Sequence, residues 1–333
     1  MNYATRKRIY RAVERDRGSK LLAFVTSDRI GMETQIAQDC IDLFVDLLDQ
    51  IGPTSKISLL LHTNGGQTSA AWRLINLIRT FCDELEVLIP LKAFSAGTLL
   101  SLGADKIVMT KQAALGPIDP SLTHPLNPPI PVGNQIARVP VSVEAVRGYL
   151  DAIKTDFAIT DQTALASIVV DLSNKIHPLV LGEIFRSRAQ IRFLAEKLIK
   201  RQVTDEEKIK KIIDFLCADS GSHDYTMNRR EAHELGLRIE KPSVEFYRTL
   251  RKIHLSYAGE LKLIEPYSPQ VLLGTNPMVN FSLVRGLVES MTACYAFLSE
   301  GTLTRNMMPG PLGATAQETI TDQRTFEGWR KVA

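Results

Sequence analysis

This chain of 333 residues has few of the features that define several large classes of protein. Only 7% of its residues are aromatic, and its net charge of +3 is the balance of 40 basic and 37 acidic residues. A charge this balanced gives no reason to expect a nucleic-acid or anionic-membrane partner. No apolar run approaches the length of a membrane span, and no signal-peptide pattern follows the charged N-terminus.

Cysteine is also scarce. Cys40, Cys82, Cys217 and Cys294 stand far apart and form no C-x-x-C pair, which indicates a reducing, cytoplasmic compartment. The six histidines show no H-E-x-x-H or comparable spacing, and neither a phosphate-binding loop nor G-x-G-x-x-G occurs. We therefore expect no metal and no other cofactor.

What the chain does have is a run of alternating apolar patterns in its first third. Continuous apolar stretches predict buried strands over 19–27, 57–63, 86–91 and 105–109. The stretches between them have helical spacing. Strands that are apolar on both faces and alternate with amphipathic helices are typical of a parallel sheet covered on both sides, so the sequence predicts an α/β fold.

The pattern changes after Met109. Residues 115–140 are rich in proline and predict a long loop. Helices are predicted from about 143, from His177-Pro178 to about 202, over 230–237 and over 283–298. Residues 301–333 hold Gly, Thr and Pro but few core residues, which predicts a tail that contributes little to the fold.

Two short stretches follow successive predicted strands. "LHTNGG" places Gly65 and Gly66 at the end of one strand, and "AFSAGT" places Ser95 after the next, at the start of a helix. Open α/β sheets bind ligands at this carboxyl edge. The N–H groups of Gly66 and Ala96 would form an oxyanion hole beside the Ser95 hydroxyl. Alternatively, Ser95 is only a helix N-cap and the glycine pair an ordinary turn.

These motifs, with "LGPIDPSL" and "SHDYTMNRREAHELGL" further along, resemble the Clp/crotonase superfamily. Within it, the chain is most similar to the serine dehydrogenase (dehydratase) proteinase family, related to ClpP and SppA, over roughly residues 19–240. The resemblance implies a Clp/crotonase-like fold with parallel sheet layers and flanking helices. It also implies a serine peptidase with Ser95 as nucleophile and Gly65, Gly66 and Ala96 in the oxyanion hole. A peptide or protein substrate and a homo-oligomer are implied as well; any ATPase partner stays open.

The general base is where the chain departs from the ClpP pattern. ClpP has a histidine after its serine, whereas the comparable position here holds Asp119, with His124 nearby. Asp119 is expected to orient the base or to fix its loop. SppA-like proteins use a lysine that leads into the long helix, and that segment offers Lys175 and His177, both expected at a helix N-terminus. Each also fits a structural interpretation, as a solvated lysine and a helix cap. Lys154 is a third candidate.

The expected organisation is an N-terminal helix over 1–18, a catalytic domain over 19–240, a helical extension over 241–300 and a tail over 301–333. The expected reaction is attack of Ser95 on an amide carbonyl, followed by release of the acyl group to water. Two alternatives stay open. One is a crotonase-type acyl-CoA enzyme that uses the same oxyanion hole without a serine nucleophile. The other is a catalytically inactive Clp-fold scaffold.

Overall fold

The computed structural model describes residues 2–118, 121–122, 124–132, 135–139, 141–219, 225–308 and 317–333. Within it the chain forms two compact units, one of residues 1–115 with 228–333 and the other of residues 116–227. The candidate Asp119 lies outside the described residues.

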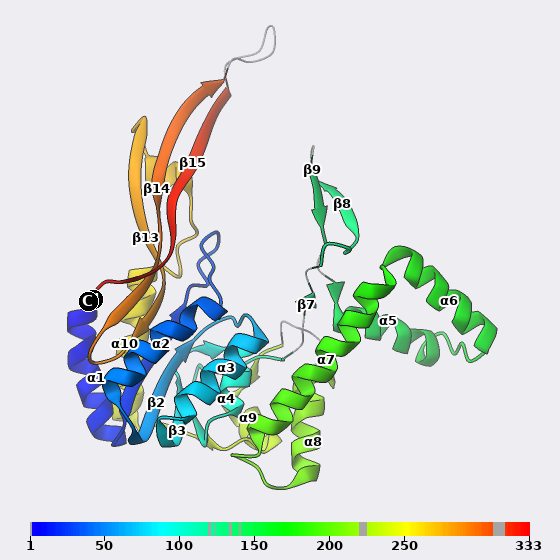
Figure 1. The fold of residues 1–333 in the computed structure, drawn as a ribbon, viewed down its shortest axis with the longest axis horizontal. Coiled ribbons are helices and arrows are strands. Elements are labelled where there is room, and N and C mark those ends of the chain that lie inside the picture. The colour runs from blue at the N-terminus through cyan, green and yellow to red at the C-terminus, as the bar shows by residue number, and fades with distance from the viewer. Residues whose placement is uncertain are drawn as a thin grey trace. The chain divides into compact units, whose positions relative to one another are not determined.

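The first unit is built on an eight-stranded sheet in the order β12-β5-β3-β2-β1-β13-β14-β15 (Figure 1). The strands from β12 to β1 are parallel to one another, whereas β13, β14 and β15 pair antiparallel. The predicted α/β fold with a parallel sheet is confirmed, as are the four predicted strands in it. The strand bounds are β1 Lys20–Thr26, β2 Thr54–His62, β3 Cys82–Ile89, β5 Lys106–Met109, β12 Ile239–Glu240, β13 Met278–Glu289, β14 Cys294–Met308 and β15 Gln317–Lys331.

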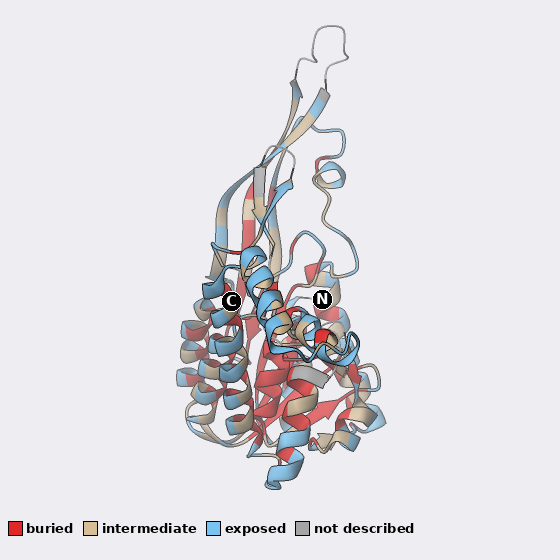
Figure 2. Ribbon diagram, turned by 90° about the vertical axis from the view of Figure 1, so that its right-hand side faces the viewer, coloured by how far each residue is buried: buried red, intermediate tan, exposed pale blue. Residues whose placement is uncertain are grey.

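Helices cover both faces of the parallel part of this sheet. Successive strand residues point to opposite sides, and because successive residues of β1 are apolar, both sides must be buried. Ala23 of β1 shares a core cluster with Tyr10 of α1 and Leu250 of α10, whereas the next residue, Phe24, meets Phe44 of α2 edge to face at 5.4 Å. In Figure 2 the buried residues gather in the strands that these helices enclose. The remaining elements of the unit are α1 Tyr3–Arg17, η1 Gln38–Cys40, α2 Ile41–Ile51, α3 Thr68–Arg79, β4 Lys92–Ala93, α4 Ala96–Leu102, β6 Ala114–Leu115, α9 Arg229–Leu235, α10 Val244–Leu261 and α11 Pro269–Leu273.

The helix predicted over 283–298 is wrong. These residues form the end of β13, a turn, and the start of β14, which pair in register from Glu289 opposite Cys294. Consecutive residues at the end of β13 are all buried because both faces of the sheet are covered there, so the strand shows no polar alternation. The turn is marked in the sequence by Ser290, whose hydroxyl accepts the N–H of Thr292 at 3.0 Å.

The predicted tail is also wrong for the described residues of 301–333. Residues up to Met308 continue β14, and Gln317–Lys331 form β15, the edge strand of the main sheet. Figure 1 shows β13, β14 and β15 running side by side well beyond the parallel strands. A composition poor in core residues misled the prediction, because threonine is a good strand former and an edge strand gains stability from cross-strand pairing.

The second unit is mainly helical. Its helix α7, Pro178–Ile199, begins after His177 as predicted. Residues 115–140 are not wholly a loop, because β8 and β9 form a small antiparallel hairpin in which Pro129 and Pro131 lie on one strand. Proline is tolerated in such an edge pair. The other elements are β7 Ser121–Leu122, β8 Pro129–Val132, β9 Gln135–Arg138, β10 Val141–Ser142, α5 Val143–Thr155, α6 Gln162–Lys175, α8 Glu206–Asp214 and η2 Phe215–Asp219. Strand β11, Met227–Asn228, contains the boundary between the two units in the sequence.

A test of length and hydropathy finds no single helix that could cross a membrane in the part of the chain that the structure describes. Helices α6 and α7 pass that test only as a pair, with a bend of 100° between them.

Candidate active site

The turn after β2 can be made only by glycine at two positions. Gly65 and Gly66 have φ angles of 113° and 147°, in the region that side chains rarely adopt. The Ile36 N–H donates to the Gly65 carbonyl at 2.8 Å, and the Gln67 N–H donates to the Ile36 carbonyl at 2.8 Å. A Cβ on Gly66 would lie 2.2 Å from the Ile36 oxygen, so these bonds hold the turn where no other residue fits.

Ser95 directly precedes α4 and has an unusual backbone. Its φ of 49° and ψ of −113° are sparsely populated by residues other than glycine, and such strain clusters at functional sites. Its side chain makes no N-cap hydrogen bond to α4, and the hydroxyl has no hydrogen-bond partner among the described residues. The interpretation of Ser95 as only a helix cap therefore loses its physical basis.

Gly65 lies in direct contact with Ser95. A Cβ on Gly65 would sit 2.7 Å from the Ser95 Cβ and 3.2 Å from the Ala96 nitrogen. Within the described ranges, the N–H groups of Gly66 and Ala96 donate to no protein acceptor. Free amides beside a serine hydroxyl are the elements of an oxyanion hole.

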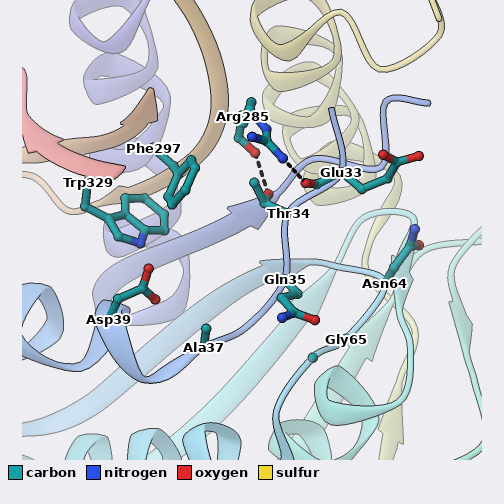
Figure 3. A pocket seen from close by; sticks show the side chains of 11 residues that line it. Glu33, Thr34, Gln35, Ala37, Asp39, Asn64, Gly65, Arg285, Phe297 and Trp329 are labelled. Atoms are coloured by element: carbon teal, nitrogen blue, oxygen red, sulfur yellow. Dashed lines mark hydrogen bonds between the residues drawn. The ribbon is translucent and has the colours of Figure 1, made fainter. Parts of the chain in front are cut away.

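A cavity of about 470 Å³ borders the same glycine turn (Figure 3). One wall is the loop 33–39 before α2, a second is the turn 64–66, and the third consists of Arg285, Phe297 and Trp329 from β13, β14 and β15. Figure 3 shows the Arg285 guanidinium directed to the backbone of Glu33, with the two aromatic rings beside it. This cavity could not be foreseen from the sequence pattern, which predicted a helix and a tail for the residues of its third wall.

The candidate bases lie in the second unit. Lys175 is the last residue of α6, so its predicted place at a helix N-terminus is wrong. His177 is the N-cap of α7, as predicted, and its Nδ1 accepts the Leu179 N–H at 3.2 Å. His124 Nδ1 likewise accepts the Leu126 N–H at 3.0 Å, with Nε2 3.7 Å from Glu183. Lys154 lies in the last turn of α5.

A buried polar cluster near the same sheet edge was also missed. His62, at the end of β2, is 1% exposed and its Nε2 lies 3.6 Å from Asp28, which also pairs with Lys92. Burial opposes ionisation of Asp28, but His62 and Lys92 outweigh it and hold the pKa of that carboxyl below its usual range. Burial and the nearby His62 lower the pKa of His254, on α10, to about 4.

This cluster lies across the sheet from the serine. Leu61 and Thr63, on either side of His62, both approach Gly97 of α4. Because side chains alternate along a strand, His62 points to the opposite face, where it meets His254. The cluster therefore contributes no group that contacts Ser95.

Comparison with known proteins assigns the chain to a family. The family profile described as ClpP-like SDH-type serine proteinase matches residues 1–254. The chain belongs to this family, which confirms the resemblance read from the sequence motifs.

Individual relatives are more distant. Uncharacterized protein MJ0137 of Methanocaldococcus jannaschii is 32% identical over 198 residues, which cover 60% of this chain and 58% of the relative. Uncharacterized protein MJ1495 of the same organism is 26% identical over 247 residues, 72% of this chain and 73% of that one.

The chain thus spans less than two thirds of the first of these relatives. Two solved structures of the 1510-N membrane-bound stomatin-specific protease, one in complex with a substrate peptide, also match. Both have a TM-score of 0.35. The first is 16% identical and covers 65% of this chain and 79% of its own length. The second, which contains the peptide, is 17% identical and covers 63% of this chain and 73% of its own length.

Proposed function

We propose that this protein is a peptidase that cleaves amide bonds through an acyl-enzyme on Ser95. The observation that carries the proposal is the Ser95 backbone, which is strained at the carboxyl edge of the sheet, together with a hydroxyl that has no hydrogen-bond partner among the residues the structure describes. Attack on a carbonyl carbon would put negative charge on the substrate oxygen, and the N–H groups of Gly66 and Ala96 would receive it. Water then releases the acyl group and restores the serine.

The base in this proposal is His177 or Lys175, with Asp119 to orient it or fix its loop. In favour of His177 is its side-chain type, since histidine is the residue that most often acts as a general base in enzymes. Its Nδ1 accepts a backbone N–H, so the neutral ring carries its proton on Nε2. To act as a base, His177 would have to give up that cap contact. Lys175 is exposed at the end of α6 and needs no such change.

The test is covalent labelling with a fluorophosphonate probe, read out as intact mass and peptide maps. We expect one adduct, on Ser95, which disappears in Ser95→Ala and persists in a control at an exposed serine, Ser55→Ala. Labelling that persists in Ser95→Ala would remove this serine from the reaction. Absence of labelling in the wild type would favour the acyl-CoA enzyme or the inactive scaffold.

The base is tested by His177→Ala and Lys175→Ala, each measured for labelling rate against pH. Loss in one variant alone identifies the base, and Lys210→Ala serves as a control at an exposed lysine of the same unit. Full labelling in both variants would reject the two residues and turn attention to His124 and Lys154.

We also propose that the protein works as a homo-oligomer in the cytoplasm on a peptide or protein substrate. In support of self-association, α6 has no buried residue and exposes Val169 and Val170, while α7 exposes Leu179 and Phe185. An apolar surface of this kind is typical of an interface. Sedimentation should give an oligomer that Val170→Ser combined with Phe185→Ser dissociates, and a wild-type monomer at micromolar concentration would contradict it.

A further inference from the structure

The cavity beside the glycine turn is positioned to receive one side chain of a substrate. Gly65 and Gly66 form part of its wall and also supply the turn that contacts Ser95. A peptide whose carbonyl oxygen lies at the N–H of Gly66 therefore has a neighbouring side chain at the mouth of this cavity.

Negative charge in the cavity is not matched by positive charge. Asp39 lines the wall and has neither an ion pair nor a hydrogen bond to its carboxylate among the described residues. Glu33 lines the same space, and within the described part of the chain its carboxylate accepts a single hydrogen bond, from the Gly31 N–H at 3.1 Å. Both side chains are exposed to solvent in the free protein. The Asp39 carboxylate beside Trp329 favours a cationic ligand, whereas the Glu33 carboxylate points away from it (Figure 3).

Arg285 supplies a positive charge in the cavity wall, but its guanidinium is already bound by other groups of the protein. Its guanidinium donates to Glu327 at 2.7 Å, to the Ser299 hydroxyl at 3.0 Å and to the Met32 carbonyl at 3.3 Å, as well as to the Glu33 carbonyl. An arginine held by a carboxylate and several neutral oxygens is a poor site for a further anion, so the wall gives an acidic ligand no partner.

The third wall supplies apolar surface for the stem of a long side chain. Phe297 and Trp329 meet edge to face with ring centroids 5.4 Å apart, and both line the cavity. Lysine and arginine combine an apolar stem with a charged end, which matches an aromatic wall next to a carboxylate.

We propose that this cavity is a specificity pocket for a lysine or arginine side chain of the peptide substrate. Phe297 and Trp329 pack against the stem, and Asp39, which lies next to Trp329, binds the cationic end (Figure 3). The proposal rests on the proposed peptidase function in taking the ligand to be a peptide.

Binding can be measured without catalysis because Trp329 is one of only two tryptophans in the chain. In the variant Ser95→Ala with Trp72→Phe, Trp329 alone reports on the cavity by fluorescence. The probes are two acetylated peptide amides that differ at one position, one with lysine and the other with norleucine, which has the same stem without the ammonium group. We expect the lysine peptide to bind about tenfold more tightly, as for loss of a charge-assisted contact in a partly exposed site.

Asp39→Asn in this background should bring the lysine peptide to the affinity of the norleucine peptide. Asp49→Asn, which removes the same charge from an exposed position outside the cavity, should leave the difference intact. Added salt should weaken only the binding of the lysine peptide.

Equal affinities for the two peptides, or a lysine preference that survives Asp39→Asn, would overturn the proposal that this cavity is a specificity pocket for a cationic side chain. This result is distinct from failure of the peptidase proposal. A wild-type protein that labels on Ser95 but shows no lysine preference would refute the pocket alone. A protein that does not label, yet binds lysine peptides through Asp39, would refute the peptidase and keep the pocket.

Discussion

Gly65 packs so closely against Ser95 that position 65 has no room for a side chain. The Cβ of an alanine at position 65 would lie 2.7 Å from the Ser95 Cβ and 2.8 Å from the Phe94 carbonyl oxygen. Neither atom can yield cheaply, since Ser95 is fixed by its backbone and Phe94 N–H donates to the Thr63 carbonyl at 3.0 Å. The substitution must therefore push the glycine turn and the serine apart.

Gly65→Ala is expected to reduce Ser95 labelling by roughly a hundredfold or more, because displacement of a reacting group by about 1 Å costs rate on this scale. The measurement is the second-order rate of fluorophosphonate adduct formation. Gly148→Ala is the control: no atom lies within 4 Å of the Cβ it would add, and Gly148 is in helix α5. A labelling rate in Gly65→Ala close to that of the wild type would show that the contact does not position the serine.

Ser95→Gly should be more stable than Ser95→Ala. Both lack the hydroxyl, but only glycine adopts a φ of 49° with ψ of −113° without strain. The difference in the free energy of unfolding should be about 1 kcal/mol or more in favour of glycine, after allowance for the greater flexibility of glycine in the unfolded chain. Urea unfolding of the two variants measures it. Equal stabilities would mean that the serine backbone is not strained.

The position of the serine could be predicted from the sequence because its signals are local. A glycine pair at the end of one apolar strand and a serine before a small-residue helix at the end of the next define the edge of a parallel sheet. The structure then shows Gly65 against Ser95, as two turns at one edge allow.

The cavity could not be predicted in this way. Its wall at Trp329 depends on β15 pairing with β14, and its wall at Arg285 on β13 pairing with β1. Such pairings join segments far apart in the chain, and no local pattern encodes them. The contact between Asp28 and His62 could not be predicted for the same reason. Asp28 follows one apolar run and His62 ends another, and neither run indicates which strand pairs beside it.

A buried ion pair holds the N-terminal helix on the sheet. Arg6 of α1 donates to both carboxylate oxygens of Glu289 in β13, at 2.9 and 2.5 Å, and both side chains are fully buried. Glu289→Gln leaves the buried guanidinium with only the partly exposed Glu260 carboxylate as a charged partner, so the expected loss of stability is at most about 3–5 kcal/mol. Calorimetry or urea unfolding checks it, with Asp151→Asn as the control because the Arg147–Asp151 pair is exposed and its loss should cost under about 0.5 kcal/mol.

The same pair gives a second, discriminating result. Arg6→Met combined with Glu289→Leu removes both charges together and should be less destabilising than Glu289→Gln alone. A double variant that loses more than the single one would mean that the hydrogen bonds to Ser256, Tyr10 and Tyr257 matter more than the ion pair.

His254 should make the protein sensitive to mild acid. Burial, with the neighbouring His62, lowers the pKa of His254 from 6.5 to about 4, so between these values the unfolded chain binds a proton that the folded chain does not. The free energy of unfolding therefore falls as the pH is lowered through this range, by at most about 3 kcal/mol. His254→Asn should flatten the pH dependence between 6.5 and 4, whereas His233→Asn, at an exposed position, should not. An unchanged slope in His254→Asn would assign the acid sensitivity to another group.

Strand β15 should be essential to the fold, in contrast to the dispensable tail that composition suggested. It pairs with β14 from Tyr295 opposite Lys331 to Met308 opposite Gln317. The ring centroid of Trp329 lies 5.4 Å from that of Phe297 and 6.4 Å from that of Phe24. A chain that ends at residue 316 would expose the edge of β14 and the aromatic cluster, and we expect aggregation or a large fall in melting temperature.

A point substitution keeps this expectation testable if the truncated chain does not fold. Trp329→Ala should cost about 3 kcal/mol in urea unfolding, because the partly buried ring packs against those of Phe24 and Phe297. Val332→Ala, at a half-exposed position beyond the strand, should cost little. If truncation and Trp329→Ala both left stability unchanged, β15 would be an appendage of the sheet after all, and the aromatic wall of the cavity would have no role in holding the fold together.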